Sequence, residues 1–419
     1  SGPVSPRQAA SRAERTAALL LPREFSYGPG PTQGLLAYIN SYASIAEALD
    51  GLDVNRLDVS QSSDGSMTVT HEVTGRLADW LGGLSPTDEA FQFRITQSFD
   101  YDEAGVPLRV RIDTDLARLL PVTAPSRPKL RDAAGSLERL ASFPPGSFPE
   151  GVVAMDDGDI LVSMLFSNEI WRFGDEAGLE LAFQLPFDAI PGRAGLFCLA
   201  RDETGTIYAN VVGGPEIHGV WRVDPSAGTA ERIITVPPFV AMNGLTVGAD
   251  GALYTVDTFG GAIWRADPAS GAATVWFASP ILRGRPFVGV YPGANGVQAQ
   301  PDGLFVTVSD TALVLSISAS DNGAPQGVKV ISREVAGDDF AVDGEGALIV
   351  TTHPFNSLVE LQTDGEQRLL AGVEDGMIGP VAAARYGDVV YVVTDGGLYA
   401  PVEGAPIEPS LFAYRLGAE

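Results

Sequence analysis

The sequence predicts two fold classes in succession: an α+β N-terminal domain, a cone-shaped barrel, and then an all-β six-bladed β-propeller. Three observations predict the propeller: a phrase that recurs about every 45 residues, short strand-like runs within each copy, and Asp-Gly turns between the runs. The copies begin at residues 150, 195, 243, 295, 339 and about 380. Six copies predict six blades.

Each copy divides into four strands. In the third copy they cover residues 244–247, 252–256, 262–267 and 273–278. A Trp-Arg pair recurs in the third strand of three copies, at Trp171, Trp221 and Trp264, and indicates packing between blades. The run 137–143 is expected to supply the outer strand of the last blade. Pairing the two ends of the chain in this way would close the ring and leave no open edge.

The front part has helical composition at 7–21 and 33–49, followed by strand-like runs. The strands are expected at 57–62, 67–75, 90–101 and 107–115, with a hairpin turn at 102–105. A Pro-rich stretch beginning at Pro121 indicates a linker. The predicted domains are therefore residues 1–125 and 137–419, joined by a linker at 126–136.

Composition narrows the function classes. The 419 residues carry 53 acidic and 27 basic side chains, a formal charge of -26, which disfavours nucleic acid and anionic membranes as partners. Cys198 is the single cysteine, so no intramolecular disulfide and no cysteine metal cluster is expected. A small-molecule substrate remains. We expect a cytoplasmic protein, or a secreted one if a leader has been removed, and predict no oligomeric state.

Four of the copies begin with an oxygen-bearing side chain at one equivalent position. Innermost strands line the central channel of a propeller, so these side chains would converge at one end of it. An all-oxygen set suits Ca²⁺ above Mg²⁺ or Zn²⁺. The alternative is that they are turn residues, because Asn-Gly is a common turn dipeptide. The predicted metal ligands are Glu150, Asn243, Asn295 and Asp339, with Asp338 as the alternative to Asp339.

The turns between second and third strands would rim a pocket above the ion. His353 is the candidate general acid or base, with an idle loop histidine as the alternative. Arg283 and Arg285 would clamp a substrate carboxylate or phosphate, or serve as ordinary surface charges. The remaining candidates are Asp257 for catalysis and Phe259, Arg285, Tyr291, Asp310, His218 and Phe355 for substrate binding.

Residues 137–418 resemble the senescence marker protein/gluconolactonase family, which includes regucalcin, lactonases and phosphotriesterases. The resemblance rests on Phe148-Pro-Glu-Gly-Val-Val, Ala241-Met-Asn-Gly-Leu-Thr-Val, Ala294-Asn-Gly-Val and Gly337-Asp-Asp-Phe-Ala-Val-Asp-Gly. In that family, Glu, Asn, Asn and Asp side chains on these blades hold a catalytic divalent metal, often calcium. The resemblance thus implies the same four ligands.

Residues 33–120 resemble the SnoaL-like polyketide cyclase family, with its cone-shaped α+β barrel. The resemblance rests on Val69-Thr-His-Glu-Val-Thr-Gly-Arg and on the hairpin from Phe91 to Leu120. It implies an acid or base on the terminal strand, where Asp113 falls, and His71 and Asp113 would form an acid–base pair in one pocket. The alternative is that His71 is a strand-face residue and that Asp113 caps a helical turn.

Three functions follow from these features. The first is a metal-dependent hydrolase of a lactone or ester, in which water or a carboxylate such as Asp339 attacks the carbonyl. The second is a cyclase or isomerase in a natural-product pathway. The third is a non-catalytic ligand-binding propeller with structural calcium. Aromatic residues near the rim favour a bulky, apolar substrate: Phe166, Phe259, Phe287, Tyr291 and Phe355.

Overall fold

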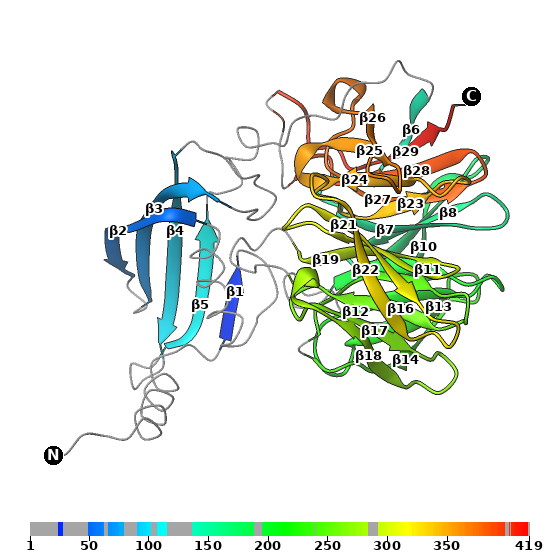
Figure 1. The fold of residues 1–419 in the computed structure, drawn as a ribbon, viewed down its shortest axis with the longest axis horizontal. Helices are drawn as coiled ribbons and strands as arrows, with labels where there is room; N and C mark the ends of the chain where they lie inside the picture. Colours follow the sequence, from blue (N-terminus) through cyan, green and yellow to red (C-terminus); the bar gives the residue numbers. More distant parts are fainter. Residues whose placement is uncertain are drawn as a thin grey trace.

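The strands that the structure describes form one five-stranded sheet and six four-stranded sheets, drawn in Figure 1. The structure is a computed structural model. It describes residues 24–27, 49–62, 66–78, 90–101, 107–114, 136–187, 195–238, 240–283, 292–398, 402 and 404–417. Short 3-10 helices connect strands at η2 (Pro280–Leu282), η4 (His353–Phe355) and η5 (Val373–Asp375). Within these ranges no helix has the length and apolar character to cross a membrane.

The N-terminal sheet has the order β1-β5-β4-β3-β2 and is antiparallel except where β1 runs parallel to β5. Its strands are β1 (Glu24–Tyr27), β2 (Leu49–Gln61), β3 (Met67–Leu77), β4 (Ala90–Tyr101) and β5 (Pro107–Thr114). The predicted meander is confirmed, and β1 is an addition to it. The predicted helices lie outside the described residues, apart from Leu49, which begins β2. An α+β class for this part therefore stays a prediction.

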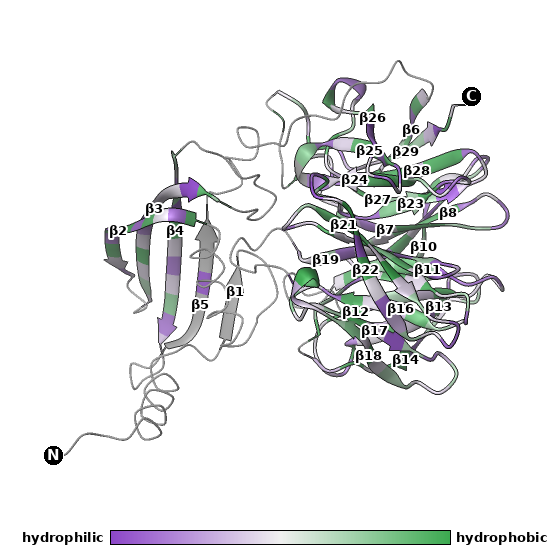
Figure 2. Cartoon of the chain, viewed as in Figure 1, coloured by the Kyte–Doolittle hydropathy of each residue, from purple (hydrophilic) through white to green (hydrophobic). Residues whose placement is uncertain are grey.

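Strand β4 of this sheet alternates apolar and polar residues, so it presents an apolar face and a polar face. Phe93 and Ile95 of β4 are buried while the intervening Arg94 is exposed, and Figure 2 shows the same alternation as stripes along β4. His71 pairs with Ile95, whereas position 113 pairs with Thr96, one residue along β4. Neighbouring positions alternate between faces. The expected pairing of His71 with Asp113 in one pocket is therefore wrong.

The six four-stranded sheets are the predicted blades, and each runs from an innermost to an outermost strand. Every blade pairs its strands antiparallel, as expected for short hairpin-connected runs. Blades one to three are β7 (Pro149–Ala154), β8 (Ile160–Met164), β9 (Glu169–Gly174), β10 (Gly178–Gln184); β11 (Gly195–Arg201), β12 (Ile207–Val212), β13 (Gly219–Asp224), β14 (Thr229–Ile234); and β15 (Met242–Val247), β16 (Leu253–Asp257), β17 (Ala262–Ala266), β18 (Ala273–Ala278). Blades four to six are β19 (Ala294–Gln300), β20 (Gly303–Val308), β21 (Leu313–Ala319), β22 (Pro325–Ser332); β23 (Phe340–Val342), β24 (Leu348–Thr352), β25 (Ser357–Leu361), β26 (Gln367–Ala371); and β27 (Pro380–Tyr386), β28 (Val389–Thr394), β29 (Ser410–Arg415), β6 (Ser136–Ser142).

The blades form a closed ring. Each innermost strand contacts the next, in the order β7, β11, β15, β19, β23, β27 and back to β7. The outermost strand of blade six is β6, which precedes all the others of the propeller and pairs antiparallel with β29 (Figure 1). Arg139 and Ser142 of this strand also bond to Glu408. The predicted closure by residues 137–143 is confirmed.

Five of the six innermost strands are irregular at the start of their repeat phrase. The pairing register shifts between Met242 and Leu245 in β15 and between Ala294 and Val297 in β19, and β7, β11 and β27 shift at the matching place. Such a bulge turns a side chain out of the regular alternation. The bulge therefore explains how the polar residue of each phrase leaves the sheet.

The glycine after that polar residue allows the innermost strands to approach closely. A Cβ on Gly244 would lie 2.3 Å from the carbonyl oxygen of Asn295, and one on Gly296 would lie 2.8 Å from that of Asp338. Real Cβ atoms do not tolerate such contacts, so these positions require glycine. The two residues of the Asn-Gly phrase thus have separate roles. The asparagine supplies a side chain to the channel, and the glycine leaves room for the innermost strand of the next blade.

Four second-strand residues, here called the clasp residues, bond from one blade to the next: Ser163, Asn210, Thr307 and Thr351. Thr307 shows the pattern. Its Oγ1 accepts the Gly296 N–H of its own blade at 2.8 Å and donates to the Asp338 carbonyl of the next blade at 2.6 Å. All four are buried, so each bond forms away from water, where an unpaired backbone group would be costly.

Candidate metal centre and its histidine

The clasp residues define one equivalent position on each innermost strand. The carbonyls that they reach belong to Phe197, Asn243, Asp338 and Val381. In the two remaining blades, Gly151 and Gly296 donate their N–H groups to the clasp residues, so the residues before them hold the position. The six positions, here called the ring residues, are Glu150, Phe197, Asn243, Asn295, Asp338 and Val381.

This equivalence selects Asp338 instead of Asp339. The Asp339 N–H donates to the clasp residue Thr351 at 3.1 Å, as Gly296 N–H does to Thr307. Asp339 therefore matches the glycine of the other copies. The linear sequence hid this because Thr351 bonds to the backbone of both aspartates, so a bulge precedes β23. The expectation that Asp339 occupies the repeat position is corrected to Asp338.

A second layer of residues lies at the end of the second strand of each blade, or directly after it. Four of them donate a backbone N–H to the residue before an innermost strand: Leu165, Thr258, Ser309 and Asp395. Val212 and His353 hold the matching place, two residues after a clasp residue. Together these six are here called the support residues. Two of them, Ser309 and His353, contact ring residues with their side chains.

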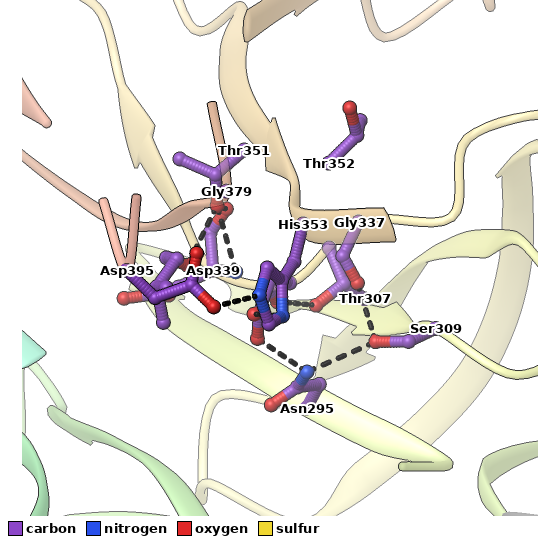
Figure 3. Close-up of polar contacts among 12 residues, drawn as sticks. Asn295, Thr307, Ser309, Gly337, Asp339, Thr351, Thr352, His353, Gly379 and Asp395 are labelled. Carbon is purple, nitrogen blue, oxygen red and sulfur yellow. Dashed lines mark hydrogen bonds and ion pairs between the residues drawn. The ribbon is translucent and has the colours of Figure 1, made fainter. Parts of the chain in front are cut away.

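Ser309 holds Asn295. The Asn295 amide nitrogen donates to Ser309 Oγ at 3.0 Å and also to Asp338 Oδ1, while Ser309 donates onward to the Gly337 carbonyl (Figure 3). Figure 3 shows the amide oxygen pointing away from both partners. The nitrogen is thus anchored, and the oxygen is oriented for another ligand.

His353 lies between two aspartates and is buried. Its Nε2 lies 3.0 Å from Asp395 Oδ2, and its Nδ1 lies 3.5 Å from Asp338 Oδ2. Asp395 is itself fixed, because its Oδ1 accepts the Gly397 N–H at 2.7 Å. The imidazole therefore joins blade five to blade six and contacts a ring residue. The imidazole thus has a hydrogen bond to Asp395 on one side and an ion-pair contact with Asp338 on the other.

The electrostatics of this cluster are those of several buried acids around one base. Burial and the charge of Asp338 raise the pKa of Glu150 well above its ordinary value. Burial raises the pKa of Asp338 to about 6 and that of Asp339 to about 8. Burial alone would lower the pKa of His353, but the carboxylates of Asp395, Asp338 and Glu150 raise it to about 9. The cluster thus favours a bound cation, which relieves repulsion among carboxylates.

The ring residues fit a hard divalent cation in their chemistry. Two carboxylates and two amides offer only oxygen, as calcium prefers. The buried Thr258 hydroxyl, the support residue beside Asn243, has no partner among the described residues. By analogy with Ser309, it would accept the Asn243 amide once the oxygen of that amide turned to an ion. Within the described chain, no three His, Cys, Asp or Glu side chains are arranged to hold a metal. A site here would therefore depend on both amides.

The other predicted site residues are more dispersed. Asp257 is buried and accepts N–H groups from Ala241 and Gly260, so it caps a turn; burial raises its pKa. His218 is buried in blade two, accepts the Gly213 N–H, and has a pKa lowered by burial. Asp310 is fully buried, while Phe259 and Phe355 are partly exposed. Arg285 and Tyr291 lie outside the described residues.

Sequence reasoning missed Ser309 and Asp395. Both follow the second strand immediately, as His353 does, after Val-Thr-Val308, Val-Thr-Thr352 and Val-Val-Thr394. Aligning this position in all six copies would have found them. The pairing of Asp395 with His353 has no sequence signal, because it joins different blades.

The class defined by this geometry is a six-bladed propeller with a buried carboxylate and amide ring at one end of its channel. No protein-family model matches the sequence, and no curated protein matches it significantly. Solved structures do match in fold. A gluconolactonase from Xanthomonas campestris is 14% identical, with 70% of this chain and 97% of that chain covered and a TM-score of 0.51.

Two further propellers give similar agreement. Regucalcin from Agrobacterium tumefaciens, a calcium-binding protein, is 16% identical over 68% of this chain and 95% of that chain, with a TM-score of 0.50. A luciferin-regenerating enzyme is 13% identical over 67% and 95%, with a TM-score of 0.50. At these identities the likeness shows a shared fold. Nothing among the comparisons supports the SnoaL-like resemblance of residues 33–120.

Proposed function

We propose that this protein is a divalent-cation-dependent hydrolase of a lactone or related ester. The observation that carries the proposal is the ring of Glu150, Asn243, Asn295 and Asp338, backed by a histidine held between two aspartates. The fold likeness to a gluconolactonase and to the calcium-binding regucalcin supports the same reaction class. Calcium is the expected ion, with Mg²⁺ or Zn²⁺ as alternatives.

The four polar ring residues would hold the ion and leave part of its coordination open to substrate. A bound divalent ion would polarise the scissile carbonyl and stabilise the oxyanion. Ser309 orients Asn295, and His353 orients Asp338, as partners behind metal ligands commonly do. His353 therefore acts as a hydrogen-bond and ion-pair partner that positions the carboxylates of Asp395 and Asp338. This differs from a free general base, because both of its nitrogens face carboxylates.

Asp339 is the proposed general base. Of the carboxyl groups in the cluster it alone is partly exposed, whereas Glu150, Asp338 and Asp395 are buried. An attacking water can reach it, and its pKa of about 8 suits proton transfer near neutral pH. The water oxygen would bond to the carbonyl carbon while one of its protons passes to Asp339. The C–O bond of the ring would then break as Asp339 returns that proton to the departing ring oxygen, which leaves a hydroxy acid.

A substrate panel tests this function. Lactones and aryl esters should be hydrolysed by the full chain, the activity should vanish with a chelator, and calcium should restore it. Asp339→Asn should lower kcat by about 100-fold or more while the ion still binds. Ion binding without hydrolysis of any panel member would favour the non-catalytic alternative. Activity that survives the chelator would refute the metal-dependent mechanism.

A further inference from the structure

The end of the channel that carries the ring residues also has a group of apolar side chains on blades one and two, here called the apolar wall. Its members are Phe148, Leu165, Phe166 and Phe197. The rings of Phe148 and Phe166 lie 5.5 Å apart. A Cβ on Gly195 would lie 2.8 Å from Leu165 Cδ1 and 3.1 Å from Phe197 Cε2, so these two side chains meet over that glycine. Phe148 is buried, but Phe166 and Phe197 are partly exposed.

The wall follows from the same equivalences that define the metal site. Blades one, three, four and five present polar ring residues, whereas blades two and six present Phe197 and Val381. The support residues are apolar on blades one and two, where they are Leu165 and Val212, and polar on the other four blades. Within the described chain, blade two is therefore apolar in both layers and blade one is apolar in its support residue, and these two blades form an apolar arc beside the more polar remaining blades.

The apolar arc meets the more polar blades at His353. The Phe148 ring packs edge-on against the imidazole, with centroids 6.3 Å apart. The aromatic path from Phe166 through Phe148 thus leads directly to the histidine that contacts Asp338. An apolar group lying on this wall would be next to the position of the reacting carbonyl.

We propose that the apolar wall is the subsite for an alkyl or aryl substituent next to the scissile ester, so that the substrate is an amphipathic lactone or ester. The proposal rests on the hydrolase function above and names its substrate class. Burial of each methylene of the substituent contributes favourably to substrate binding. The four side chains of the wall offer no hydrogen-bond partner to the hydroxyl groups of a sugar. A polyhydroxylated sugar lactone is accordingly a poor substrate.

A pair of lactones that differ only in the tail tests the wall. δ-Valerolactone and δ-decalactone share the same ring ester, and the latter carries a pentyl chain. Wild-type protein with calcium should prefer the longer lactone by about tenfold or more in kcat/KM. Phe166→Ala and Phe197→Ala should each remove most of that preference, measured as the ratio of kcat/KM for the two lactones. Phe183→Ala, in the outermost strand β10 of blade one, is the control and should keep the preference.

Binding of the ring-opened products separates this proposal from the hydrolase function. Calorimetry with calcium present should show tighter binding of 5-hydroxydecanoate than of 5-hydroxypentanoate, and Phe166→Ala should abolish the difference. If neither lactone is hydrolysed but the difference in affinity between the two acids persists, the hydrolase function is refuted and the apolar wall is supported as a binding subsite. Equal binding of the two acids, or equal kcat/KM for the two lactones, overturns the wall.

Discussion

Asp338 and Asp339 are adjacent in the chain and differ in role. Asp338 is a ring residue that contacts Asn295 and His353, whereas Asp339 takes the place of a glycine and is partly exposed. Asp338→Asn should weaken calcium binding by more than about tenfold, because it removes a charged ligand. Asp339→Asn, the matched change one residue along, should leave the affinity within about threefold. Calorimetry measures both, and a larger loss for Asp339→Asn would restore Asp339 as the ligand.

The raised pKa values predict how stability depends on pH in the ion-free protein. The folded state keeps protons on Asp339 up to about pH 8 and on His353 up to about pH 9, above their unfolded pKa values. A folded state that binds more protons loses stability as pH rises. The melting temperature in chelator should thus fall between pH 7 and pH 9.

Calcium and one variant provide the controls for this pH dependence. Bound ion should reduce the fall, because it compensates the carboxylates. Asp339→Asn should reduce it as well, since the variant has no proton to lose at that position. A melting temperature that stays constant or rises over the same interval would contradict the cluster's electrostatics.

Among the elements, the second strands matter because their clasp residues join the blades. Thr307→Val keeps the shape of the side chain but leaves the Gly296 N–H and the Asp338 carbonyl without this partner. The free energy of unfolding should fall by about 1 to 3 kcal/mol. Urea denaturation measures it. Thr274→Val, at an exposed position of the outermost strand β18, is the control and should change stability by less than about 0.5 kcal/mol. Equal effects would show that the clasp contributes nothing.

Strand β6 closes the last blade, so removing it should open the ring. A chain lacking residues 1–142 would expose the edge of β29. It should lose roughly 3 to 5 kcal/mol relative to a chain lacking residues 1–135, which corresponds to about 10 °C in melting temperature. Thermal unfolding of the two truncations makes the comparison, and identical melting temperatures would mean that β6 is dispensable.

For the whole molecule, we expect the predicted boundary at 121–136 to separate two independently packed parts. Limited proteolysis should cut there first, because exposed Pro-rich connections are preferred sites, and should release a stable propeller fragment beginning near β6. Mass spectrometry of the fragments locates the cut. Digestion without a lasting fragment from either side would argue against two domains.

The repeat made most of the propeller predictable. Counting phrases gave the blades, the position of the ring closure, and Glu150, Asn243 and Asn295 as equivalent residues. The choice between Asp338 and Asp339 was not predictable, because the bulge that separates them depends on hydrogen bonds to Thr351. Asp395 was not predicted as a site residue for a related reason, because its hydrogen-bond partner His353 lies 42 residues away in another blade. A one-dimensional period shows equivalence within a ring, but it does not show contacts between neighbouring blades.

The pairing of β6 with β29 also determines when the ring can close during synthesis of the chain. Arg139 and its partner Glu408 are 269 residues apart, so β6 leaves the ribosome long before the strand it needs exists. At roughly 5 to 20 residues per second, that interval lasts about 15 to 50 seconds. During this interval β6 lacks its partner strand and has an unpaired edge, while the strands of the other blades are synthesised. The nascent chain is therefore open to capture by another strand until β29 has been synthesised, and the ring can close only after that point.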